Sequence, residues 1–107
     1  MKSFKLNDMT RGWFVGNFTP TALQTEAAEV AVKFYKAGDR EIWHYHRIAT
    51  EITLILQGEV RMNGTTWKSG DILLMEPNEG TDFEALTAVT TVVVKVPSVR
   101  GDKFTRE

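Results

Sequence analysis

Apolar and polar residues alternate in short runs along most of the chain, and glycine, proline, asparagine or aspartate interrupts these runs every few residues. A period of two is typical of strands, whereas no stretch carries the sustained apolar stripe of an amphipathic helix. We therefore predict an all-β chain with nine short strands: Gly12–Phe18, Ala28–Tyr35, Glu41–Ile48, Ile52–Leu56, Glu59–Met62, Thr65–Trp67, Asp71–Met75, Asp82–Leu86 and Thr91–Val96.

Turn-forming dipeptides separate the predicted strands. Asn63-Gly64 stands between two strand-like runs and favours a two-residue hairpin, and Gly70-Asp71 marks a further turn. Short strands joined by tight turns are typical of an antiparallel barrel or sandwich. Because 107 residues fall below the length at which a second domain is common, we expect one domain.

The alternation also predicts which side chains face the interior. Between Ala28 and Phe34 the even-numbered positions are apolar, so we expect them to point inward. The strand Ile52–Leu56 is apolar on both faces, and it should be covered on both, by a second layer or by a partner subunit.

Composition narrows the functional classes. Thirteen basic residues balance fourteen acidic ones, so nucleic acid and anionic membranes are not expected partners. The absence of cysteine excludes disulfides, thiolate ligands and a cysteine nucleophile. No apolar run approaches the roughly 20 residues that span a bilayer, and the first residues lack the apolar core of a signal peptide. We expect a soluble, cytoplasmic protein.

The candidate chemistry lies in one predicted strand, which holds both histidines of the chain, His44 and His46. Residues two apart on a strand share a face, and Ile42 and Ile48 fall on that face, so the imidazoles are expected to point inward. Glu51 begins the next strand and completes a set of two imidazoles and one carboxylate. Such a set binds iron, manganese, nickel or zinc and leaves positions open for a ligand. The alternative is an exposed histidine pair beside a solvated glutamate.

The spacing around the histidines resembles the first conserved motif of the cupin superfamily. Gly38 is followed after five residues by His44 and His46, after four more by Glu51, and after six more by Gly58. The resemblance implies a double-stranded β-helix, the jelly-roll barrel of that family. It also implies a divalent metal ion on the two histidines and the glutamate inside the barrel, with a small organic ligand beside it.

The second cupin motif is incomplete in this chain. The run from Gly70 to Pro77 resembles its opening, but the third histidine that usually follows is missing. If Phe83 faces the barrel, alternation points Thr81 inward, and Thr81 is then the expected replacement. A register slip of one residue would make Asp82 the fourth ligand instead.

The resemblance covers about residues 30–96. Residues 1–27 are expected to form N-terminal strands or an arm, and residues 98–107 a polar, solvated tail. Members of the family often form homodimers by pairing sheets or exchanging an N-terminal strand, so the resemblance implies a homodimer.

The function implied is that of a metal-dependent enzyme, an isomerase, epimerase or dioxygenase, acting on a sugar, keto acid or phenol. Tyr45, Asp82 and Glu84 are candidate proton carriers at the barrel mouth. Tyr45 belongs to the strand face opposite the histidines, where packing against another sheet or subunit is the alternative. Two other hypotheses stay open. One is a non-catalytic module that binds or senses a small molecule, and the other is a metal-free sugar-binding barrel whose histidines form hydrogen bonds with hydroxyl groups.

Overall fold

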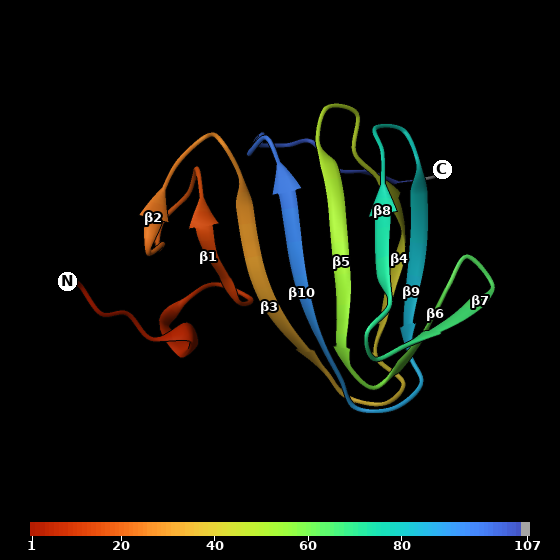
Figure 1. The fold of residues 1–107 in the computed structure, drawn as a ribbon. Helices are drawn as coiled ribbons and strands as arrows, with labels where there is room; N and C mark the ends of the chain where they lie inside the picture. Colours follow the sequence, from red (N-terminus) through yellow and green to blue (C-terminus); the bar gives the residue numbers. More distant parts are fainter. Residues whose placement is uncertain (106–107) are drawn as a thin grey trace.

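In the computed structural model, which describes residues 1–105, two β-sheets face each other and enclose the interior (Figure 1). The larger sheet contains, in spatial order, β2 (Leu23–Gln24), β1 (Trp13–Gly16), β3 (Glu29–Tyr35), β10 (Val89–Val96), β5 (Thr50–Gln57) and β8 (Ile72–Met75). The smaller sheet contains β11 (Phe104–Thr105), β4 (Arg40–Tyr45), β9 (Gly80–Ala85), β6 (Glu59–Met62) and β7 (Thr65–Lys68). All pairs are antiparallel except β1 with β2.

The all-β prediction is confirmed, and every predicted strand is present with small shifts of its ends. Two short strands, β2 and β11, escaped prediction because two residues are too few to show a period. The one helical element within residues 1–105 is the 3-10 turn η1 (Leu6–Asp8). No helix in this part of the chain has the length and apolar character needed to cross a membrane.

The predicted hairpin at Asn63-Gly64 joins β6 to β7. Both residues have positive φ, 50° and 77°, and Met62 pairs directly with Thr65 across the turn. Two consecutive positive φ values are the signature of a type I′ turn, which matches the twist of the flanking strands. The dipeptide therefore fixes the register of this hairpin, as its sequence indicates.

The prediction that even-numbered residues of β3 face inward is wrong. Ala31 is fully buried, whereas Phe34 is 68% exposed, so the odd positions point into the barrel. The apolar and polar faces of β3 are reversed because this part of the barrel interior is polar, and Lys33 and Tyr35 line a cavity there. The N-terminal segment partly covers the outer face, where Val32 shares a pocket with Phe4, Leu6 and Met9.

The hydrophobic core fills only part of the space between the sheets. Its buried members come from β5, β6, β9 and β10 and are Ile55, Val60, Met62, Phe83, Ala85 and Val89. Along β5 the buried Ile55 belongs to this core, while Glu51 and Thr53, on the same strand face, line a cavity. The barrel is therefore sealed by apolar packing near Ile55 and polar farther along the strand.

Candidate metal centre

A β-bulge in β4 sets the direction of the histidines. The pairing of β4 with β9 shifts register between Glu41 and His44, which places both of these side chains on the cavity side. Ile42 is 72% exposed and Ile48 is 57% exposed, so the expectation that they share the inward face of the histidines is wrong. The extra residue of the bulge breaks the simple alternation on which that expectation rested.

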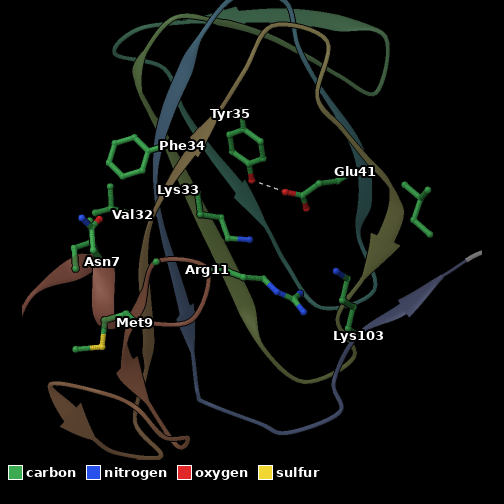
Figure 2. A pocket seen from close by; sticks show the side chains of 12 residues that line it. Asn7, Met9, Arg11, Val32, Lys33, Phe34, Tyr35, Glu41 and Lys103 are labelled. Carbon is green, nitrogen blue, oxygen red and sulfur yellow. Dashed lines mark hydrogen bonds between the residues drawn. The ribbon is translucent and has the colours of Figure 1, made fainter.

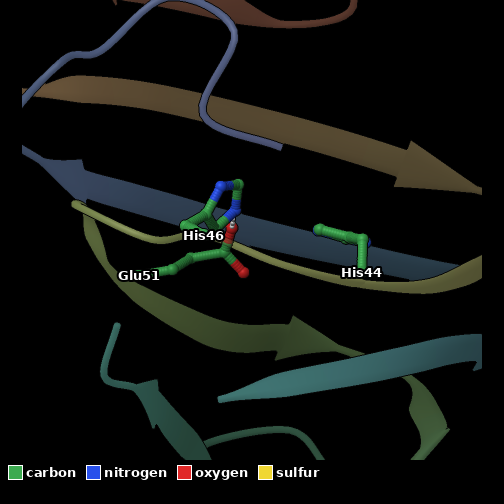
Figure 3. A group of neighbouring side chains, drawn as sticks. All are labelled: His44, His46 and Glu51. Carbon is green, nitrogen blue, oxygen red and sulfur yellow. Dashed lines mark hydrogen bonds and ion pairs between the residues drawn. The ribbon is translucent and has the colours of Figure 1, made fainter. Parts of the chain in front are cut away.

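The structure brings His44, His46 and Glu51 together, as the sequence predicts (Figure 3). One ligand atom from each residue can be chosen such that all three lie within 4.8 Å of one another. The imidazole centroids are 5.4 Å apart, and His46 Nε2 lies 3.2 Å from Glu51 Oε1. His46 is buried, and the other two are partly buried.

Backbone carbonyls orient both imidazoles. His46 Nδ1 contacts the carbonyl oxygen of Asp102, and His44 Nδ1 lies 3.3 Å from that of Ile42. A carbonyl only accepts, so Nδ1 of each ring carries a proton, and Nε2 of a neutral His44 keeps its lone pair. The contact of His46 Nε2 with Glu51 Oε1 requires a second proton on that ring, and a metal ion would bind there in place of this proton. Such carbonyl partners commonly fix the tautomer of metal-ligating histidines. Thr53 Oγ1 likewise donates to Glu51 Oε2 over 3.4 Å.

The three residues fit a first-row divalent metal ion. Ligand atoms placed about 2.1 Å from a common ion stand roughly 3.4 Å apart in tetrahedral geometry. The ligand atoms lie up to 4.8 Å apart, so they would have to move about 1 Å closer together to bind one ion, a distance within reach of side-chain rotation. Two imidazoles with one carboxylate also leave coordination positions free for a ligand.

The electrostatics of the site favour ligand binding by a neutral His44 and an ionised Glu51. Burial lowers the pKa of His44. Burial acts in the same direction on His46, but the bonds to Glu51 and to the Asp102 carbonyl outweigh it and raise its pKa. The pKa of Glu51 is lowered despite burial, because His46 bonds to it and both histidines lie nearby.

The C-terminal segment belongs to the site, and its prediction as a solvated tail is wrong. Asp102 is buried, and its carboxylate accepts the backbone N–H groups of Arg47, Ile48 and Ala49 at 2.9, 3.1 and 2.9 Å. These bonds turn the chain out of β4 immediately after His46. They also explain why β4 ends at Tyr45 rather than at the predicted Ile48. Residues 106–107 of the predicted tail lie outside the described residues.

Thr81 faces the barrel and pairs with His44 across β4 and β9. It is 7% exposed, and Phe83 beside it on the same face is 8% exposed. Asp82 is exposed, and its carboxylate accepts the N–H of Asn63 over 2.8 Å. The structure therefore has the register in which Thr81, and not Asp82, turns toward the histidines; its role as a ligand stays a prediction.

The expected proton carriers do not point at the centre. Tyr45 packs on Phe104, with ring centroids 5.6 Å apart, on the face opposite the histidines. Glu84 accepts bonds from Arg40 and Arg61 at 3.0 and 3.1 Å on the outer surface. Both lie on the outer side of their strands. Asp82 borders the inner cavity but is exposed, and its carboxylate is bound to Asn63, so position argues against a proton-transfer role for all three.

One cavity contains the centre, and a second cavity shares lining residues with it. The inner one, about 200 Å³, is lined by the three candidate ligands together with Thr53 and Thr81, and the outer one is about 690 Å³. Sequence reasoning missed the cavity residues Tyr35 and Glu41, whose hydroxyl and carboxylate are hydrogen-bonded to each other. The alternation of polar and apolar residues in β3 could have indicated Tyr35, but such alternation normally predicts that the polar face points to solvent.

Comparison with known proteins identifies the fold. No protein-family model matches the chain, and no curated protein matches it. Among solved structures, a conserved protein with a double-stranded β-helix domain from Klebsiella pneumoniae is 20% identical, with a TM-score of 0.74. That match covers 99% of this chain and 92% of the other.

Two enzymes share the same architecture. DMSP lyase DddQ from Ruegeria pomeroyi is 17% identical, with a TM-score of 0.71, over 87% of this chain and 49% of that one. A sugar phosphate isomerase from a cupin superfamily, from Silicibacter pomeroyi, is 19% identical, with a TM-score of 0.64, over 72% of this chain and 54% of that one. The chain thus spans about half the length of either enzyme. The chain therefore has the fold of a double-stranded β-helix, and in fold it is similar to structures of the cupin superfamily.

Proposed function

We propose that this protein is a cupin and a metal-dependent enzyme that acts on a small oxygen-rich molecule, such as a sugar, keto acid or phenol, at His44, His46 and Glu51. One observation carries the proposal: the three ligand atoms converge inside a cavity while backbone carbonyls hold both imidazoles. The lyase and the isomerase of the same fold support an enzymatic role.

A divalent metal here would polarise a bound carbonyl or hydroxyl oxygen. The two imidazoles and the carboxylate would hold it, and the cavity that they line would admit the substrate. Tyr35 and Glu41 replace the expected proton carriers, because they line the same cavity and share a hydrogen bond. Burial and the neighbouring Glu41 raise the pKa of Tyr35, so its hydroxyl keeps its proton at neutral pH and can donate a hydrogen bond to a bound substrate.

The second candidate function is a module that binds or senses a small molecule without turnover. The absence of a third histidine favours it, since Thr81 stands where a fourth metal ligand would face the cavity. A metal-free sugar-binding barrel is a weaker variant, in which the histidines bond hydroxyl groups.

Metal analysis of the purified protein tests the centre. After incubation with manganese, iron, nickel or zinc and removal of excess ion, we expect one ion per chain. His44→Ala, His46→Ala and Glu51→Gln should each reduce the bound metal severalfold, whereas Glu59→Gln, an exposed carboxylate on β6, should not. Equal metal content in all variants, or none in the parent protein, would contradict the centre.

A second assay separates enzyme from binding module. The metal-loaded protein is incubated with sugars, keto acids and phenols while oxygen uptake and substrate loss are followed. Turnover that disappears in Tyr35→Phe with metal content intact would support the enzyme and the role of the Tyr35 hydroxyl. Bound metal and bound ligand without turnover would favour the sensing module.

A further inference from the structure

Five residues line both the inner and the outer cavity and therefore form a neck between them: Arg11, Lys33, Tyr35, Glu41 and Lys103. Figure 2 shows the side chains of Arg11, Lys33, Glu41 and Lys103 pointing into one space between β3 and β4. A molecule moving from the outer cavity to the candidate metal centre passes these groups.

The neck carries an excess of positive charge. Arg11, Lys33 and Lys103 face a single carboxylate, that of Glu41, which already accepts the Tyr35 hydroxyl. Within residues 1–105 none of the three cations forms a salt bridge. Burial lowers the pKa of Lys33; Glu41 opposes this shift, and Lys103 adds to it. Lys33 is partly buried and lies 5.4 Å from the centroid of the Trp13 ring, whereas Arg11 and Lys103 are exposed. Three cations beside one carboxylate give the neck a positive potential, which favours an anion.

The backbone holds Arg11 at the neck. Arg11 and Gly12 have φ values of 52° and 83°, and Trp13 N–H donates to Thr10 over 3.0 Å, which makes a type I′ turn. A Cβ at Gly12 would lie 1.9 Å from the carbonyl oxygen of Val32, so the turn sits directly against β3. The side chain is thus presented by a tight turn rather than by a loose loop.

A second observation concerns Thr91. It is 1% exposed, lines the inner cavity, and its hydroxyl has no hydrogen-bond partner among residues 1–105. In the pairing of β10 with β3 it stands directly opposite Lys33. A buried hydroxyl without a partner is rare in folded proteins and points to a polar occupant of the cavity.

We propose that the neck binds the carboxylate of a small organic acid, with Arg11, Lys33 and Lys103 supplying charge and Thr91 donating a hydrogen bond. The rest of the molecule then lies toward His44, His46 and Glu51, and in this placement alone the inference rests on the proposed function. An organic acid fits better than a bare inorganic anion, because Trp13, Phe83 and Val93 also line the inner cavity. Its volume of about 200 Å³ selects a small molecule.

Titration of the protein with pyruvate, followed by backbone amide chemical shifts, tests the proposal. Metal-free protein is used first, so that the result does not depend on the metal centre. We expect saturable shifts at Lys33 and Thr91, and at least about tenfold weaker binding of the uncharged pyruvamide. Equal binding of the amide, or tighter binding of inorganic phosphate than of pyruvate, would overturn the carboxylate assignment.

Variants locate the binding groups. Arg11→Gln and Lys33→Gln should each weaken pyruvate binding about tenfold, whereas Arg40→Gln removes the same charge from an exposed ion pair with Glu84 and should have no effect. Thr91→Val should weaken binding while leaving the thermal midpoint unchanged or raising it, because it removes an unpaired buried hydroxyl. An equal loss in Arg40→Gln would show a general charge effect and overturn the site.

Repetition with metal-loaded protein keeps the two proposals distinguishable. Pyruvate binding that survives in a protein without metal affinity removes the proposed metal centre and leaves the neck intact. Metal binding with no response to pyruvate overturns the neck and leaves the metal centre intact.

Discussion

His44 and His46 look equivalent in the sequence, but the structure gives them different partners. His46 is held between the Asp102 carbonyl and Glu51, whereas within residues 1–105 His44 has only the longer hydrogen bond with the Ile42 carbonyl, at 3.3 Å. Across the sheet from His44 stands Thr81, whose hydroxyl donates to the Asp82 carbonyl over 2.7 Å. At the residue scale, the open side of the centre is therefore beside His44.

Replacing Thr81 by histidine tests this geometry. A third imidazole opposite His44 would complete a four-ligand set, and we expect Thr81→His to raise zinc affinity by about tenfold or more. Competition with a chelating dye measures the change, and Thr81→Val serves as the control that removes the hydroxyl without adding a ligand. Unchanged affinity in a folded Thr81→His protein would mean that Thr81 does not face the metal.

At the element scale, the segment from Ser98 to Thr105 holds the site strand in place. Ser98 is buried and its hydroxyl donates to Glu29 over 2.8 Å, Asp102 caps the turn after β4, and β11 pairs with the end of β4. The backbone carbonyl of Asp102 also accepts a hydrogen bond from His46 Nδ1. The same residue therefore positions a candidate ligand and ends the strand that carries it.

The variant Asp102→Asn should lose about 1.5–3 kcal/mol of stability at neutral pH, since a charged acceptor of three N–H groups becomes a neutral one. Although burial opposes ionisation, the bonds from Ala49, Arg47 and Ile48 lower the pKa of Asp102 below 3.8. A carboxyl whose pKa is lower in the folded than in the unfolded state stabilises the folded protein at pH values above its unfolded-state pKa. This stabilisation is lost as the pH falls through the folded-state pKa.

Urea unfolding of both proteins between pH 2 and about pH 7, with a chelator present, measures the difference. The difference in free energy of unfolding between the two proteins should have its full size above about pH 4 and should become smaller in more acidic solution. A gap that stays constant down to the lowest pH would show that the charge of Asp102 does not contribute.

The sequence predicted the strands, the hairpin at Asn63-Gly64 and the meeting of the three candidate ligands, because these depend on local period and spacing. It failed where tertiary context reverses a local pattern. The bulge in β4 turns Ile42 outward, and the polar interior reverses the expected faces of β3. The role of Asp102 depends on contacts more than 50 residues apart in the chain, which no local pattern carries.

At the scale of the whole molecule, one outer face of the larger sheet remains apolar and exposed. Leu56 on β5 is 55% exposed, and Ile72 and Leu74 on the edge strand β8 are 66% and 55% exposed. An exposed apolar edge strand is a favoured place for pairing between chains. We therefore predict that the homodimer forms through this face.

Light scattering after size-exclusion chromatography tests the assignment. We expect the parent protein to elute as a dimer and Leu74→Glu to shift it to a monomer, because a buried carboxylate would oppose association. The control Leu23→Glu places the same charge on β2, at the other edge of the sheet, where Leu23 is 60% exposed. A monomeric parent protein, or an equal effect of both variants, would contradict this interface.

The proposed metal centre requires that two imidazoles and one carboxylate inside the barrel bind a divalent ion. The most direct measurement is anomalous scattering from crystals grown with zinc or manganese, collected on both sides of the metal edge. We expect one strong peak about 2.0–2.2 Å from a ring nitrogen of His44, a ring nitrogen of His46 and an oxygen of Glu51. Ions bound only elsewhere on the protein, with no peak among these three residues, would contradict it.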